Sequence, residues 1–250
     1  MLDKSLLEPL ATLSGDFGIV FEQGQSRVCL NADKPLVAAS VIKLWVMLAA
    51  FQAFRDGKLR PDDEYVLSAR DKVPSCGALT YLSDGLRLKL TDLVTLMIIL
   101  SDNTATNVLI DRLGIGYINE VARKYGFDGV SLGRKLFDEE ADQRGINNFV
   151  SPAATALFMR GLLSGDLVSP SASRKMLRIL SDQRLNGKMP FRLHCLGIRC
   201  AHKTGEDDGI SHDVGIIYTP EPTIAVFMCN NADVPGFERF IQDCSFKLTI

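Results

Sequence analysis

The chain has 250 residues, of which 46% are hydrophobic and 23% are charged, and its formal net charge at pH 7 is -2. This composition is typical of a globular protein with one large domain or two small ones, and it gives no electrostatic reason to expect binding to nucleic acid or to an anionic membrane. The longest apolar run, residues 36–51, is too short to cross a membrane and contains Lys43.

The N-terminal residues predict a short amphipathic helix and then a β-hairpin. Two β-like runs, 17–23 and 27–33, flank a turn at Gly24-Gln25-Ser26. The first residues lack the basic start, the continuous apolar stretch and the small-residue cleavage site of a secretory signal. As written, the sequence therefore predicts a cytoplasmic protein, or a periplasmic or secreted one if a leader has been removed.

After Pro35 the pattern becomes helical, with helices predicted over 40–55, 91–100, 104–113, 116–125 and 152–163. The β pattern returns near the C-terminus in three runs, 197–205, 213–219 and 223–230, and a helix closes the chain. Sequential hairpins favour an antiparallel sheet. We therefore expect an α+β fold in which an antiparallel five-stranded sheet, formed from residues 1–36 and 181–250, encloses an all-α insertion over 37–180.

The cysteines and histidines form no motif that binds a metal. The six cysteines are scattered and include no Cys-x-x-Cys pair, and the three histidines form no HExxH or Cys/His pattern. Isolated cysteines in a chain of this length are more typical of reduced thiols than of disulfides. We expect no metal and no cofactor.

Ser40 and Lys43 stand at the start of the most apolar helix in the chain. From Val41 to Phe51 the run contains no polar face, which indicates a buried helix. An unpaired ammonium there is costly, so Lys43 needs a partner or a shifted pKa. Residues three apart share a helix face, so the amine can reach the Ser40 hydroxyl. This geometry suits a serine nucleophile with an amine base, and it equally suits a helix cap with a lysine that reaches toward solvent.

Two further short motifs favour the catalytic interpretation. Ser101-Asp102-Asn103 lies between two predicted helices, and Lys203-Thr204-Gly205 ends a predicted strand. Each is common by itself, but the order S-x-x-K, S-D-N, K-T-G is that of the penicillin-recognising serine enzymes. The chain resembles this family over nearly its whole length, and most closely the class A β-lactamases, with residues 75–114 similar throughout.

The resemblance implies a β-lactamase/transpeptidase-like fold with the active site in the cleft between the two parts. Ser40 would form an acyl-enzyme, Lys43 would be the neighbouring amine base, and Ser101 would relay a proton to the leaving nitrogen. The N–H groups of Ser40 and Glu206, the latter just beyond Gly205, would form the oxyanion hole. The substrate-binding residues implied are Asn103 for the amide side chain, Lys203 and Thr204 for the carboxylate, and the adjoining Gly205 and Glu206. The expected partner is a small molecule, a β-lactam or a related amide or ester, bound by a monomer.

The sequence departs from the family at the base that hydrolyses the acyl-enzyme. Class A enzymes carry a Glu-x-x-Leu-Asn pattern on the loop after the helical core, and here the expected glutamate falls on Lys135 or Leu136. The nearest acids follow directly, and Glu139 is the favoured substitute, with Asp138 or Glu140 as alternatives. Arg134 matches a loop arginine of the family, but its expected acidic partner falls near Asn147 and Asn148.

Three functions stay open at this point. The protein is a β-lactamase with impaired or altered deacylation, or an esterase, amidase or penicillin-binding protein of the same fold that acts on another substrate, or a sensor without turnover. His202 is interpreted as a strand residue beside the cleft rather than as a general base.

Overall fold

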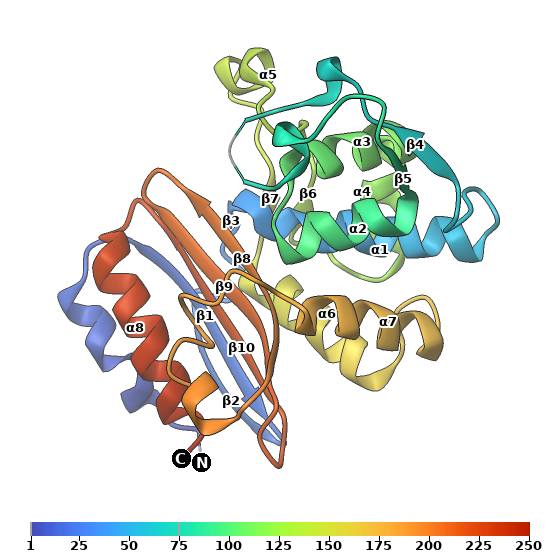
Figure 1. The fold of residues 1–250 in the computed structure, drawn as a ribbon. Coiled ribbons are helices and arrows are strands. Elements are labelled where there is room, and N and C mark those ends of the chain that lie inside the picture. The colour runs from blue at the N-terminus through green and yellow to red at the C-terminus, as the bar shows by residue number, and fades with distance from the viewer. Residues whose placement is uncertain (1, 75) are drawn as a thin grey trace.

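The structure is a computed structural model that describes residues 2–74 and 76–250. Its main sheet has five antiparallel strands in the order β2-β1-β10-β9-β8 (Figure 1). The strands are β1 (Asp16–Gln23), β2 (Ser26–Leu30), β8 (Cys200–Asp207), β9 (Ile210–Ile217) and β10 (Thr223–Asn230). The α+β class and the antiparallel five-stranded sheet built from both ends of the chain are therefore confirmed.

The sheet forms because its central strands are apolar on both faces. In β10, Ala225, Phe227 and Cys229 belong to one hydrophobic cluster, whereas Val226 and Met228 belong to the other. Successive side chains of a strand point to opposite faces, so a strand covered on both sides must be apolar at nearly every position. Both faces of the sheet are thus committed to packing.

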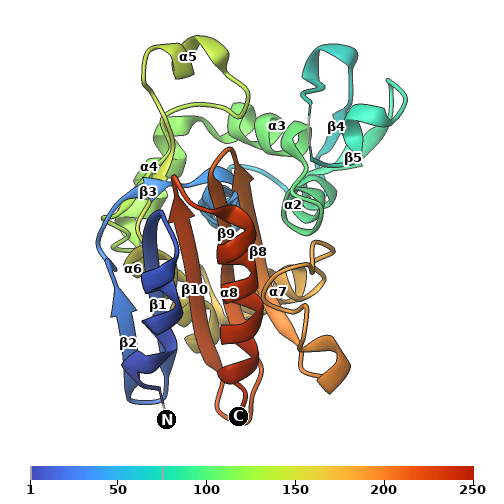
Figure 2. The same ribbon diagram turned by 90° about the vertical axis from the view of Figure 1, so that its left-hand side faces the viewer.

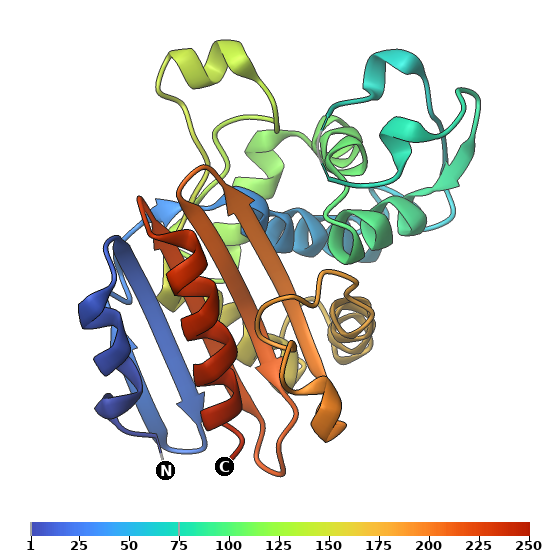
Figure 3. The same cartoon turned by 60° about the vertical axis from the view of Figure 1, so that its left-hand side comes forward.

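Helix α8 (Val234–Lys247) and a 3-10 helix, η1 (Lys4–Thr12), cover the outer face of the sheet (Figures 2 and 3). Phe237 of α8 stacks on Phe17 of β1, with ring centroids 5.2 Å apart. The predicted N-terminal and C-terminal helices are thereby found in contact on one face of the sheet.

The other face of the sheet packs against the helical part of the chain, through α6 (Pro152–Ser164) and α7 (Pro170–Ser181). The remaining helices of this part are α1 (Lys43–Arg55), α2 (Leu90–Ile99), α3 (Asn103–Leu113), α4 (Ile115–Lys124) and the short α5 (Glu139–Gln143). Helix α1 is its centre: the residues from Leu44 to Ala50 are fully buried. The apolar run therefore forms a core helix, as the sequence predicts.

The structure differs from the sequence expectations in three places. The middle of the chain is not entirely helical, because it also contains the short strands β3 (Leu36–Val37), β4 (Glu64–Val66), β5 (Arg87–Lys89), β6 (Val130–Ser131) and β7 (Phe149–Val150). Helix α7 was not expected from the sequence. Lys203-Thr204-Gly205 lies inside β8 rather than at its end, because pairing with β9 continues to Asp207 and Ile210. In the described part of the chain, no helix is long and apolar enough to span a membrane.

Candidate active site

Ser40 lies in a single 3-10 turn, η2 (Ala39–Ile42), that leads directly into α1. Ala39 has a φ of +41°, a backbone conformation that L-residues adopt rarely and that is stable only when the surroundings enforce it. The turn is held between β8 on one side and the buried helix on the other. This tight entry into α1 fixes the Ser40 hydroxyl next to Lys43, which is the first residue of the helix.

The Lys43 amine is fully buried and surrounded by oxygens. Its Nζ lies 2.8 Å from Ser40 Oγ, 2.9 Å from Ser101 Oγ, 2.8 Å from Ser101 O and 2.8 Å from Asn103 Oδ1. The backbone carbonyl and the amide oxygen can only accept, so they occupy two N–H groups. That leaves one position of the tetrahedral nitrogen for the two hydroxyls of Ser40 and Ser101, and in a neutral amine this position is a lone pair that can accept a proton from either hydroxyl.

The Lys43 environment favours this neutral form. Burial lowers the Lys43 pKa well below its usual value, and the positive charge of Lys203 lowers it further, whereas Cys76 and Asp102 act in the opposite direction. An amine whose pKa is lowered by burial and that contacts a serine hydroxyl is equipped to act as a general base.

Ser101 lies between the two lysines. Its Oγ is 2.9 Å from the Lys43 Nζ and 3.0 Å from the Lys203 Nζ. Ser101 has a φ of +53° at the sharp turn between α2 and α3, which directs its side chain back toward α1. Lys203 also donates to Thr204 O at 2.7 Å, and burial lowers its pKa to about 7. A single hydroxyl therefore connects two buried amines.

Asp102 connects the start of α3 to the loop that precedes it in the site. Its carboxylate accepts from Ala105 N (2.9 Å), Ala78 N (2.7 Å) and Leu79 N (2.9 Å). The first bond caps α3 and the other two anchor the preceding loop on the turn. Asn103 N also donates to Cys76 O at 3.2 Å. This anchoring places Cys76 on the wall of the cavity that contains Ser40.

Gly205 allows β8 to pass close to the turn that carries Ser40. A Cβ on Gly205 would lie 3.0 Å from His212 Cδ2, 3.2 Å from Val41 Cγ2 and 3.3 Å from Ala38 O. A glycine at this position therefore lets the backbone that leads into Glu206 approach Ser40. His212, which lies next to Gly205, is fixed by both of its ring nitrogens. Its Nε2 lies 2.9 Å from Val37 O, and its Nδ1 accepts from Cys229 N at 3.2 Å.

His212 and His202 are structural rather than catalytic in their placement. His212 is fully buried, which lowers its pKa to about 4, and both of its ring nitrogens contact backbone groups. His202 is 1% exposed, and its Nδ1 lies 2.7 Å from Asp213 Oδ1. Neither imidazole contacts Ser40 or Ser101, which agrees with the interpretation of His202 as a strand residue.

The cavity above Ser40 has a volume of about 560 Å³, which is sufficient for a small-molecule substrate. The predicted residues Ser40, Asn103 and Glu206 line it, and Lys43, Ser101, Lys203 and Thr204 are buried around its base. Residues that the sequence analysis did not propose for the site also line it: Val37, Ala39, Cys76, Phe137, Asp142, Asp207 and Asp208. No local motif marks these positions, because folding of four separate segments brings them to the cavity.

The loop opposite Ser40 is held in place by hydrogen bonds between its backbone and asparagine side chains. Leu136 N donates to Asn107 Oδ1 at 2.9 Å, and Asn107 Nδ2 donates to Leu136 O at 2.8 Å. These two bonds fix Leu136 on the cavity wall, whereas Lys135 turns outward to an ion pair with Asp111 at 3.1 Å. Of the two positions at which the resemblance would place the glutamate, Leu136 is thus the one that lines the cavity.

Arg134 also has a different partner from the one expected at Asn147 and Asn148. Its guanidinium forms an ion pair with Asp142 Oδ1 of α5 at 3.0 Å. Asn148 instead binds the backbone of the loop, accepting from Gly133 N (2.8 Å) and Arg134 N (3.0 Å). The loop therefore closes through a local ion pair and a neutral amide.

The three acids proposed as substitute bases have different surroundings. Glu139 lines the cavity. Asp138 also lines it, but its carboxylate caps α5 by accepting from Ala141 N at 3.0 Å. Glu140 is exposed and does not belong to the cavity wall. In the described part of the chain, no cluster of histidine, cysteine and acidic side chains could hold a metal ion.

Comparison with known proteins gives the relationship directly. A sequence model of the beta-lactamase enzyme family matches residues 2–248. The chain belongs to the beta-lactamase enzyme family. A relative named beta-lactamase from Rhodobacter capsulatus is 30% identical over 208 residues, which cover 76% of this chain and 70% of the relative.

Solved structures agree with the beta-lactamase fold. The crystal structure of a beta-lactamase from Sphaerobacter thermophilus DSM 20745 has a TM-score of 0.90 and 32% identity, and the match covers 99% of this chain and 97% of that one. PBP-A has a TM-score of 0.88 and 25% identity, over 98% and 93% of the two chains. A leucine-to-glutamate variant of PBP-A, in an acyl-enzyme complex with penicillin G, has a TM-score of 0.85 and 26% identity, over 98% and 92%.

Proposed function

We propose that this beta-lactamase family member forms an acyl-enzyme on Ser40 with penicillins and hydrolyses it slowly. The observation that carries the proposal is the contrast between the two sides of one cavity. On one side the Lys43 amine, whose pKa is lowered by burial, lies 2.8 Å from Ser40 Oγ. On the other side Leu136, one of the two positions at which the resemblance places the hydrolytic glutamate, lines the cavity wall.

Acylation needs only groups that are in contact. The Lys43 amine takes the Ser40 proton as Oγ attacks the lactam carbonyl, and the N–H groups of Ser40 and Glu206 stabilise the oxyanion. The lactam C–N bond then breaks, and its nitrogen takes a proton from the Ser101 hydroxyl. Lys43, 2.9 Å from Ser101 Oγ, returns the proton to Ser101, and Lys203 at 3.0 Å stabilises any negative charge on that oxygen. Lys43 ends neutral.

Deacylation needs a base that activates water, and a leucine side chain has no such group. Loss of a positioned base typically costs about two to four orders of magnitude in rate. The expected result is an acyl-enzyme that accumulates.

The test follows the mass of the intact protein after mixing with benzylpenicillin. We expect one added penicillin per chain within the first time points, followed by slow return to the free mass. A chromogenic cephalosporin should show a burst of about one equivalent before the slow phase. Fast hydrolysis without a burst would contradict the proposal.

Ser40→Ala is the matching control for the nucleophile. This variant should show no added mass, because the hydroxyl that forms the ester is missing. Labelling that persists on Ser40→Ala at another side chain would overturn the assignment of the nucleophile.

The amide variants Asp138→Asn, Glu139→Gln and Glu140→Gln test the remaining base. If Glu139 activates water from its place on the cavity wall, only Glu139→Gln should slow the second phase while leaving the burst intact. Equal slow phases in all three variants would show that none of these acids supplies the base.

A second candidate is an esterase or amidase of the same site acting on a non-lactam substrate. It is favoured by the same Leu136 wall, because an acyl group smaller than an opened penicillin leaves room for water beside the ester. A panel of thioesters with short acyl groups would distinguish the two. Rapid turnover of a thioester by the wild-type chain, lost in Ser40→Ala, supports this second activity.

A further inference from the structure

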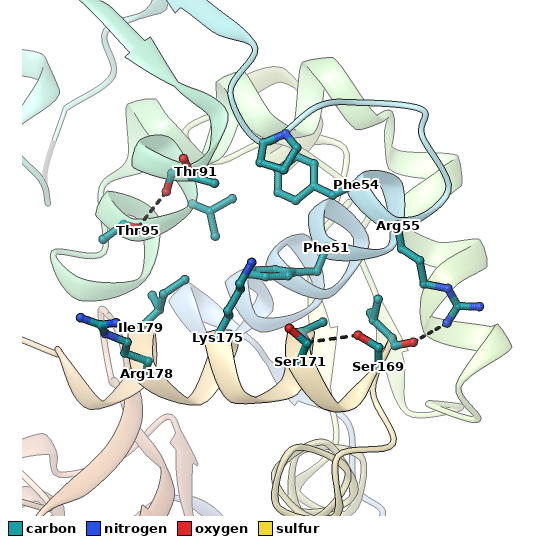
Figure 4. Close-up of a pocket in the computed structure, with 14 residues that line it drawn as sticks. Phe51, Phe54, Arg55, Thr91, Thr95, Ser169, Ser171, Lys175, Arg178 and Ile179 are labelled. Atoms are coloured by element: carbon teal, nitrogen blue, oxygen red, sulfur yellow. Dashed lines mark hydrogen bonds between the residues drawn. The ribbon is translucent and has the colours of Figure 1, made fainter.

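A second cavity, of about 450 Å³, lies between α1, α2 and α7 (Figure 4). It shares no lining residue with the cavity above Ser40. Its volume falls in the range of small-molecule sites. The function proposed for Ser40 does not use this cavity, so any ligand here is a separate matter.

The cavity has an apolar lining and a basic rim. Phe51, Phe54, Val94 and Ile179 are among its apolar residues. The charged residues that line it are all cationic: Arg55, Lys175 and Arg178. In Figure 4 the Lys175 side chain extends from α7 toward the ring of Phe51, with its nitrogen inside the cavity mouth.

Two of these cations are available for a ligand. Among the residues that the structure describes, neither Lys175 nor Arg178 forms an ion pair or hydrogen bond through its side chain, and both are exposed at the rim. Arg55 is partly engaged, because its guanidinium donates to Val168 O. Charged groups that face the same apolar cavity from one helix create a local positive potential, strongest where low-dielectric walls limit screening.

The wall formed by Val168 is firmly held. Val168 has a φ of +64°, which is unusual for a β-branched residue. Its carbonyl accepts from Arg55, and its N–H donates to the Tyr125 hydroxyl at 3.0 Å. Tyr125 in turn donates to Gln52 Oε1 of α1 at 2.7 Å. These hydrogen bonds stabilise the unusual backbone conformation of Val168 and hold this wall of the cavity in place.

We propose that this cavity binds a small amphipathic monocarboxylate of the medium-chain fatty acid type. The apolar chain would cover the phenylalanines and the aliphatic floor, a burial that stabilises the complex in proportion to the apolar area removed from water. The carboxylate would lie at the rim between Lys175 and Arg178. A neutral ligand would leave both cations without a partner, and a cationic one would be repelled.

The probe for this site is decanoate, added to the full chain and followed by methyl NMR and calorimetry. We expect one saturable site, with shifts in the methyl groups of Val94, Val168 and Ile179. Decyltrimethylammonium, with the same chain and the opposite charge, should bind at least tenfold more weakly, and decanol should also bind more weakly. Equal affinity for decanol and decanoate would overturn the role of the cations.

Charge reversal at the rim gives the second test. Lys175→Glu combined with Arg178→Glu should weaken decanoate binding at least tenfold. Arg174→Glu is the matched control, because Arg174 is an exposed cation on the same helix that does not line the cavity, and its effect should stay within twofold. Equal weakening by both, unchanged binding in the double variant, or methyl shifts elsewhere would each refute the site. The melting temperature and penicillin labelling of every variant show that it is folded.

Discussion

At the scale of single residues, Lys43 and Lys203 share the hydroxyl of Ser101, yet the proposed chemistry needs them in different charge states. Lys43 has to be neutral to take a proton, whereas Lys203 has to be charged to hold the substrate carboxylate. The two requirements support each other, because the charge on Lys203 lowers the Lys43 pKa.

The pH dependence of acylation follows from this pair. Acylation should rise with pH as Lys43 loses its proton at its lowered pKa, and fall again as Lys203 loses its proton above about pH 7. In Lys203→Met the alkaline limb should disappear. The acid limb should move to higher pH, because without the Lys203 charge Lys43 keeps its proton longer. Stopped-flow acylation rates, each normalised to its maximum, provide the measurement. An alkaline limb that survives in Lys203→Met would assign it to another group.

Lys43→Arg tests the base itself. Arginine keeps the charge but does not lose its proton in proteins, and its planar guanidinium is larger. We expect acylation to slow by roughly a hundredfold or more, the scale of a lost general base. Near-normal acylation would mean that the charge at this position, rather than its basicity, matters.

Leu136→Glu should convert slow deacylation into turnover. Asn107 fixes the Leu136 backbone by two hydrogen bonds, so a glutamate there would keep its main-chain position on the cavity wall. Deacylation should accelerate by about two to four orders of magnitude, and the acyl-enzyme should no longer accumulate. Leu136→Gln is the control, with a similar side chain and no base. Equal rates in the two variants would show that space, not basicity, limits the reaction.

At the scale of elements, the site depends on how helix ends and loops are tied together. Asp102 caps α3 and anchors the loop that carries Cys76, whereas Asp92 of α2 makes an exposed bond to Lys89 N at 3.1 Å. Both are acidic groups at the start of a helix, but only Asp102 connects the helix to the site.

Asp102→Ala should therefore lower the free energy of unfolding by roughly 2–4 kcal/mol, since it removes a cap and leaves buried N–H groups without partners. It should also slow acylation. Asp92→Ala should cost about 1 kcal/mol or less and leave acylation unchanged. Chemical denaturation and stopped-flow labelling measure the two effects. Identical acylation in both variants would contradict the anchoring role of Asp102.

Elements with strong periodicity or motifs could be predicted from the sequence, and those that depend on distant partners could not. The apolar run after Ser40 and the three motifs are local features of the sequence. Helix α1 and the proximity of Ser40, Lys43, Ser101 and Lys203 could therefore be predicted from it. Helix α7 was missed because it opens with the polar stretch Pro170-Ser-Ala-Ser-Arg-Lys. The cavity position of Cys76 depends on bonds to Asp102, which no local pattern shows.

At the scale of the whole molecule, the sheet and the helical part share packed surfaces through α6, α7 and β8. Trp45, the single tryptophan, is fully buried in the helical part, in contact with Phe127 and Phe158. Phe237 lies across the sheet, against Phe17 and Phe240. The two aromatic clusters therefore lie in different parts of the structure, one in the helical part and one on the outer face of the sheet.

Phe237→Ala should lower the free energy of unfolding by about 3–5 kcal/mol, the range for a buried phenylalanine. Because the parts share their core, the Trp45 fluorescence midpoint should shift as far as the far-UV circular dichroism midpoint. Phe191→Ala is the control, since Phe191 is 58% exposed, and it should change little. A shift confined to circular dichroism would mean that the two parts unfold separately.

The pairing of β1 with β10 also has a consequence for synthesis on the ribosome. Asp16 is paired with Asn230, so β1 of the N-terminal hairpin cannot pair with β10 until almost the entire chain has been synthesised. During that time the hairpin carries an open edge and uncovered apolar side chains, the features that promote aggregation. The helices α1 to α4, which lie between the two strands in the sequence, pack on one another and can form meanwhile. The emerging chain should therefore depend on chaperones that cover its first hairpin, and premature termination before β10 should leave the β1–β2 and β8–β9 pairs unconnected beside the helical part.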